Sequence, residues 1–159
     1  MMAQIFISYR REGARWITRA LYERLTNDGY DVFLDVATLR TERYDEALYQ
    51  GVAQCTDFIL LLPINALDRC ENEDDWVKKE IASALKKEKH IISLAEDGFE
   101  FPANLPESIE NIRFYNRIPI NHNLFDEAVA RIEKELISRK FQFLQWHTGE
   151  NGFKYDYKN

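Results

Sequence analysis

The chain has 159 residues, of which 45% are hydrophobic, and 27 acidic residues against 21 Lys and Arg give it a formal net charge of −6. This length allows one compact domain with a sizeable core. The acidic balance argues against a broad nucleic-acid or anionic-membrane surface, because such surfaces depend on a positive field. A small anionic ligand, held by a few well-placed cations, is compatible with it.

Cysteine and histidine are too few and too scattered for a disulfide framework or a zinc site, so we expect no metal. They are Cys55, Cys70, His90, His122 and His147. The amino-terminal residues lack a charged leader followed by a long apolar stretch. We therefore expect neither a signal peptide nor a membrane anchor, and a reducing cytoplasmic location.

Short apolar runs alternate with longer amphipathic stretches along the chain. We predict strands over Ile5–Tyr9, Asp31–Asp35, Phe58–Leu62, Ile91–Leu94 and Ile112–Tyr115. The first three are almost continuously hydrophobic, as strands covered on both faces are. The alternation predicts an α/β flavodoxin-like fold, a five-stranded parallel sheet of order 2-1-3-4-5 with helices on both faces.

Apolar residues at helical spacing predict the helices between these strands. The stripes are Ile17–Leu25, Leu48–Cys55, Val77–Leu85 and Phe125–Leu136. The stretch Ala95–Glu110 has no such stripe and contains two prolines, so we expect an ordered loop with a short or missing helix. We assign residues 1–145 to the domain and residues 146–159 to a polar tail or linker remnant.

Ligands of open α/β sheets bind beyond the carboxyl ends of the strands. Arg10 and Arg11 follow the first predicted strand there and precede a helix. Two arginines in this place can hold a pyrophosphate by bidentate bonding. The alternative is a solvated charged turn in which Arg11 pairs with Glu12.

Trp76 and Glu80 are four residues apart and share one face of a predicted helix. A carboxylate beside an indole can lie in a partly apolar pocket and stabilise a developing cation. In the alternative reading, Trp76 covers the edge of the core and Glu80 is a surface acid paired with Lys79 or Lys87.

Four further residues lie near the same edge. Asp35 ends the second predicted strand and can contact a ribose or, as an isolated Asp more often does, cap a turn. Tyr44 and Phe101 lie in expected loops and can stack on a base or extend the core. Cys70 has no histidine near it in sequence, so we assign it a structural role.

Taken together, these motifs resemble the TIR domain family, and within it the branch that cleaves NAD+. The matching segments are Ile5–Arg11, Val32–Asp35, Ala66–Cys70, Asp75–Ile81 and Asp97–Glu100. Their order and spacing carry the resemblance over Ala3–Lys140, almost the whole chain.

The resemblance implies an NAD+ glycohydrolase or cyclase that releases nicotinamide and ADP-ribose or a cyclic isomer of it. NAD+ is then the substrate, and no cofactor is expected. It implies that Glu80 is catalytic, that Trp76 shapes the pocket, and that Tyr44 and Phe101 lie near the base or nicotinamide. The residues implied along the phosphates are Tyr9, Arg10 and Arg11.

The resemblance also implies assembly with other TIR domains, a fused or separate sensor module, and a bacterial immune role activated by oligomerisation. Residues 37–44 lack the glycine common in the family's assembly loop. Two other functions stay open: a non-catalytic TIR adaptor, and a protein that binds nucleotides without cleaving them.

Overall fold

The computed structural model describes residues 4–34, 42–140, 145–149 and 152–156. Its centre is a five-stranded parallel sheet with the order β2-β1-β3-β4-β5, which confirms the predicted topology. The strands are β1 (Ile5–Ser8), β2 (Val32–Leu34), β3 (Asp57–Leu62), β4 (His90–Ala95) and β5 (Arg117–Pro119).

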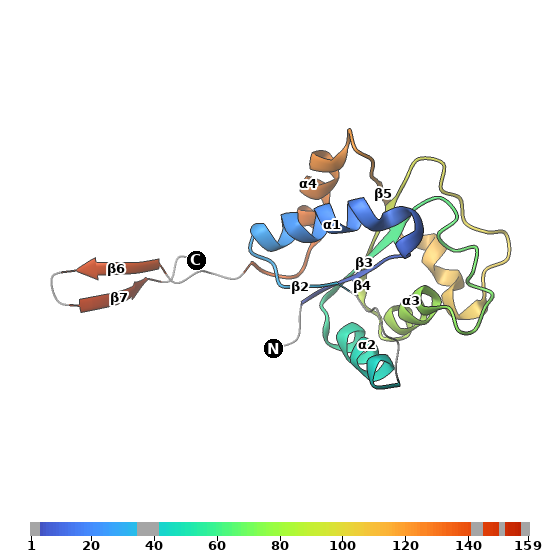
Figure 1. Ribbon diagram of the computed structural model, residues 1–159, viewed down its shortest axis with the longest axis horizontal. Helices are drawn as coiled ribbons and strands as arrows, with labels where there is room; N and C mark the ends of the chain where they lie inside the picture. The colour runs from blue at the N-terminus through green and yellow to red at the C-terminus, as the bar shows by residue number, and fades with distance from the viewer. Residues whose placement is uncertain (1–3, 35–41, 141–144, 150–151, 157–159) are drawn as a thin grey trace.

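Helices cover both faces of the sheet, with α1 and α4 on one side and α2 and α3 on the other (Figure 1). They are α1 (Arg11–Asn27), α2 (Glu42–Gln54), α3 (Trp76–Lys86) and α4 (Phe125–Glu135), with a 3-10 helix η1 (Glu107–Phe114). The stripes predicted from the sequence fall on these helices, except that Cys55 and Leu136 lie one residue beyond the ends of α2 and α4.

The continuous hydrophobicity of β3 follows from this double cover, because successive side chains point to opposite faces. Phe58 and Leu60 pack in the core under α2, α3 and η1. Ile59 and Leu61 pack in the core under α1 and α4. All four are at most 2% exposed, so both faces of the central strand are dry.

The predicted fifth strand at Ile112–Tyr115 is wrong. Ile109 and Ile112 are both fully buried and three residues apart, which is the period of the 3-10 helix η1 that carries them. The residues between β4 and η1 form a loop, and η1 is short, which agrees with the expected ordered loop with a short or missing helix. The actual edge strand, β5, has three residues with only Ile118 buried, too short to leave a clear apolar run.

The start of α1 is bent at a glycine. Glu12 and Gly13 have non-helical backbone angles, and Gly13 lies in the left-handed region with φ +86°. A Cβ on Gly13 would also lie 3.4 Å from Cβ of Pro63. The bend separates the first residues after β1 from the regular part of α1.

A buried carboxylate joins the amino end of β3 to the segment after α4. Asp57 is fully buried, and its Oδ2 accepts hydrogen bonds from the backbone N–H and the hydroxyl of Ser138. Its Oδ1 accepts from the backbone N–H of Ile137 and lies 2.5 Å from Nδ1 of His90. Asp57 therefore fixes the chain as it leaves the sheet, at the edge opposite to the carboxyl ends of the strands.

Residues assigned to a tail form, together with Gln145, a two-stranded antiparallel sheet. Its strands are β6 (Gln145–Gly149) and β7 (Gly152–Asp156), and they form a sheet of their own (Figure 1).

Candidate active site

A cavity of about 230 Å³ opens beyond the carboxyl end of β1, beside the start of α3. It brings together five residues predicted from the sequence: Tyr9, Arg10, Arg11, Trp76 and Glu80. The others that line it are Glu12, Arg69, Asn72, Asp74, Asp75 and Val77. It lies where ligands of doubly wound sheets bind.

Glu80 is the most buried acid of this cavity, at 3% exposure. It lies in the second turn of α3, and its neighbours Val77 and Ile81 anchor that helix in the core. Glu80 is therefore no surface acid. A carboxylate in so enclosed a place stands in a low effective dielectric, where it interacts strongly with a nearby positive charge.

Trp76 combines both roles considered for it. The indole is half-buried against the core under α2 and α3, and it also lines the cavity. The ammonium of Lys79 lies 4.8 Å from the centre of its ring. Trp76 thus gives the cavity an apolar wall whose rim carries a positive charge.

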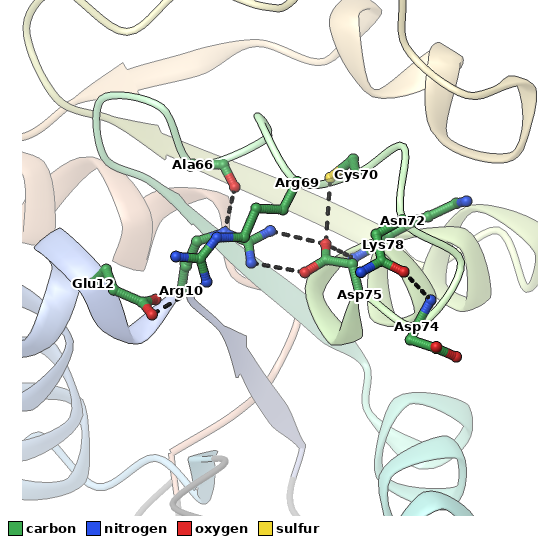
Figure 2. A network of polar contacts seen from close by, with 9 residues as sticks. All are labelled: Arg10, Glu12, Ala66, Arg69, Cys70, Asn72, Asp74, Asp75 and Lys78. Atoms are coloured by element: carbon green, nitrogen blue, oxygen red, sulfur yellow. Dashed lines mark hydrogen bonds and ion pairs between the residues drawn. The ribbon is translucent and has the colours of Figure 1, made fainter.

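Arg10 is the centre of a buried polar network that includes both ends of the segment from Ala66 to Asp75 (Figure 2). Its Nε donates to the carbonyl of Ala66 at 2.6 Å. Its Nη1 and Nη2 donate to the two carboxylate oxygens of Asp75 at 2.7 and 2.8 Å. Three of its five N–H donors are thus used inside the protein.

Asp75 is also the N-cap of α3, since its Oδ2 accepts from the backbone N–H of Lys78 at 3.1 Å. The same oxygen lies 3.5 Å from Sγ of Cys70, which donates to it. One carboxylate therefore links β1, the loop before α3 and the first turn of α3.

The ionisation of this network follows from its burial and its pairing. Burial alone raises the pKa of Asp75, but the hydrogen bonds and charge of Arg10, with the Lys78 N–H, outweigh it and hold the pKa below its ordinary value. Burial followed by the charge of Asp75 raises the pKa of the Cys70 thiol to about 12. The thiol therefore stays protonated at neutral pH and is a poor nucleophile.

The rim of the cavity is polar and exposed. Arg69 donates to Glu12 at 3.2 Å, which joins the loop before α3 to the start of α1. Asn72 accepts from the backbone N–H of Asp74 at 3.0 Å. The sequence did not predict Arg69, Asn72 and Asp75 as site residues, because no local pattern marks them.

Comparison with known proteins shows the family of this chain. The sequence profile of the TIR domain family matches residues 5–133. The chain belongs to the TIR domain family. Its sequence is 36% identical over 133 residues to a Danio rerio protein named NAD(+) hydrolase SARM1, covering 80% of this chain and 18% of that protein. It is 31% identical over 141 residues to NAD(+) hydrolase sarm1 of Drosophila melanogaster, covering 86% and 10%.

This TIR domain therefore spans only about a tenth to a fifth of the length of these relatives. Among solved structures, the TIR domains of the activated Roq1 resistosome match it with a TM-score of 0.63 and 15% identity. That match covers 84% of this chain and 98% of the other. At this identity the likeness establishes the fold.

The structure does not bring all predicted residues of the TIR domain to the cavity. Phe101 packs edge-on against Phe99 at 5.1 Å, with the guanidinium of Arg117 5.1 Å from its ring. It belongs to the periphery of the core and does not line the cavity. Tyr44 lies in α2 rather than in a loop, and its side chain, like the whole of Asp35, lies outside the described residues.

Two general features of the described part of the TIR domain complete the site. No group of three or more His, Cys, Asp or Glu side chains in it could hold a metal ion. None of its helices combines the length and apolar character needed to cross a membrane.

Proposed function

We propose that this TIR domain cleaves the bond between nicotinamide and ribose in NAD+, with Glu80 as the catalytic carboxylate. The observation that carries the proposal is the position of Glu80, buried to 3% exposure yet lining a cavity with Trp76 and Arg11. The names of the fly and zebrafish relatives, both NAD(+) hydrolases, support it.

The chemistry needs little more than one well-placed carboxylate. Nicotinamide is a cationic substituent in NAD+, so its departure requires no general acid. The C–N bond breaks, its electron pair neutralises the ring nitrogen, and the ribose carbon becomes oxocarbenium-like, as in glycoside cleavage. Glu80 bonded to the ribose hydroxyls would orient the sugar and stabilise this charge. Attack by water then gives ADP-ribose and releases a proton.

The volume of the cavity indicates how much of NAD+ one TIR domain encloses. A volume of about 230 Å³ is below the roughly 300–1,000 Å³ of sites that enclose a drug-sized ligand. It is suited to the nicotinamide riboside end of NAD+, while the rest of the dinucleotide extends beyond it. We therefore include in the proposal that a second TIR domain covers the remainder when the protein assembles, and that assembly activates turnover.

The adaptor function predicts a cleft beside Glu80 that side chains fill. Within the described residues the cleft is open, with polar groups around its rim, which favours the enzymatic proposal over the adaptor. Cyclisation remains the alternative outcome of the same cleavage, in which a group of the substrate replaces water as the nucleophile.

The test is to incubate concentrated protein with NAD+, with and without a crowding agent, and to follow nicotinamide by chromatography. Glu80→Gln keeps the size of the side chain and removes its charge, and it should slow release on the order of 100-fold. Glu110→Gln, at an exposed position of η1, is the matched control and should behave as wild type. The mass of the second product separates ADP-ribose from its cyclic isomer, which contains one water less.

Absence of release from assembled wild-type protein would refute the proposal. Equal release by Glu80→Gln and wild type would refute the role of Glu80. Saturable NAD+ binding without any product would instead support a non-cleaving nucleotide binder.

A further inference from the structure

Arg10 and Asp75 lie 65 residues apart in the sequence, and their contact is one of the most enclosed polar contacts beside the cavity. Their side chains are 10% and 7% exposed, and both carboxylate oxygens accept from the guanidinium (Figure 2). The pair connects Arg10, the residue before α1 and two positions after the end of β1, to the residue before α3. It therefore joins the segment that follows β1, an interior strand of the sheet, to the helix that carries Glu80.

A buried ion pair of this kind is weak evidence for stability, because desolvation offsets most of the attraction between the charges. Its bidentate geometry, however, defines both distance and orientation. Asp75 has two functions at once, since the oxygen that accepts from Arg10 Nη2 also caps the helix through the N–H of Lys78. Any shift of the guanidinium therefore moves the helix cap.

The helix transmits that shift to the cavity. Glu80 is five residues after Asp75, about 7.5 Å along the axis of α3 at 1.5 Å per residue. A tilt of about 10° at the cap displaces Glu80 by about 1 Å over this length. A misplacement of about 1 Å at a reacting group can cost on the order of 100-fold in rate.

Arg10 also holds the loop before α3. Its Nε donates to the carbonyl of Ala66 in the first part of the loop before α3, while its Nη atoms bind Asp75, where that loop ends. Arg69, which lines the cavity, lies within this loop. A lysine at position 10 would keep the charge but could not present donors in this fork geometry.

We propose that Arg10 and Asp75 are a positioning pair, which holds the first turn of α3 in place and thereby fixes the position of Glu80 in the cavity. In this arrangement Arg10 is not a ligand of the substrate phosphates. The inference rests on the proposed NAD+ cleavage. It assigns the cationic contact with the phosphates to residues at the rim, where Arg69 is mostly exposed and lines the cavity.

The test compares Arg10→Lys and Arg69→Gln in steady-state nicotinamide release, together with hydrogen exchange at the first turn of α3. Arg10→Lys should lower kcat at least about tenfold, leave KM within about threefold, and speed exchange at the Lys78 amide. Arg69→Gln should raise KM while kcat stays within about threefold. Arg19→Gln, an exposed change on α1, should leave all three quantities unchanged.

A folding defect is addressed by the double variant Arg10→Met with Asp75→Leu, which replaces the buried pair by apolar groups of similar size. It should remain folded and still show the lowered kcat. If Arg10→Lys raises KM at unchanged kcat, Arg10 binds the phosphates and the inference is overturned. If the wild-type protein releases no nicotinamide, the proposed function is refuted. If hydrogen exchange at the Lys78 amide is unchanged in Arg10→Lys, the positioning role of the pair is refuted, whatever the outcome for the proposed function.

Discussion

Replacing Asp57 with alanine should destabilise the TIR domain far more than changing an exposed aspartate. Asp57 is fully buried and accepts from two groups of Ser138, which is itself 8% exposed, so water cannot replace the lost acceptor there. Each such bond to a charged acceptor contributes about 1.5–3 kcal/mol, and removing one partner leaves the other unsatisfied. The two together predict a loss of about 3–5 kcal/mol in the free energy of unfolding.

Urea unfolding followed by circular dichroism measures this loss, and in a domain of this size it corresponds to a fall in Tm of roughly 10 °C. Hydrogen exchange at the amides of Ile137 and Ser138 should speed up in the same variant, because both donate to Asp57. Asp68→Asn, at an exposed position, is the control and should stay within about 0.5 kcal/mol of wild type. A loss below about 1 kcal/mol in Asp57→Ala would refute the reasoning that this carboxylate holds the chain after α4.

Three further predictions concern the site and its supports. The lowered pKa of Asp75 means that its contribution to stability is complete above its ordinary pKa of 3.8 and is lost as the pH falls below that value. The difference in free energy of unfolding between wild type and Asp75→Asn should therefore stay constant at neutral pH and shrink as the pH falls below 3.8. A difference that stays constant in acid would contradict the pairing with Arg10. Gly13→Ala should lower the urea midpoint by the equivalent of about 1–2 kcal/mol, because alanine is strained at φ +86°; an unchanged midpoint would show that the bend at the start of α1 relaxes freely. Burial raises the pKa of the Cys55 thiol to about 11, and burial together with the charge of Asp75 raises the pKa of the Cys70 thiol to about 12. Native protein at neutral pH should therefore resist alkylation, whereas denatured protein should take up two labels, as measured by mass. Rapid labelling of the native protein would contradict the burial of these thiols.

Much of the site could be predicted because its residues are close together in sequence. Trp76 and Glu80 share a helix, so their spacing of four already places them on one face. The position of Arg10 and Arg11 after β1 likewise follows from the rule that ligands bind at the carboxyl edge. The partner of Arg10 could not be read in this way, because Asp75 is 65 residues away and no local pattern links the two.

The hydrophobic pattern alone determined the alternation of strands and helices and the two-sided burial of β3, because burial on both faces leaves a periodic record along the chain. The alternation also favoured a parallel sheet with helices on both faces. It failed at β5, where three residues with one buried side chain carry too little periodicity. Only the tertiary structure decided that Glu80 is enclosed rather than exposed and that Phe101 stays outside the cavity. It also decided the partners of two buried carboxylates, Ser138 for Asp57 and Arg10 for Asp75. Each of these depends on contacts between segments distant in sequence, and burial and pairing of charges are properties of the assembled fold.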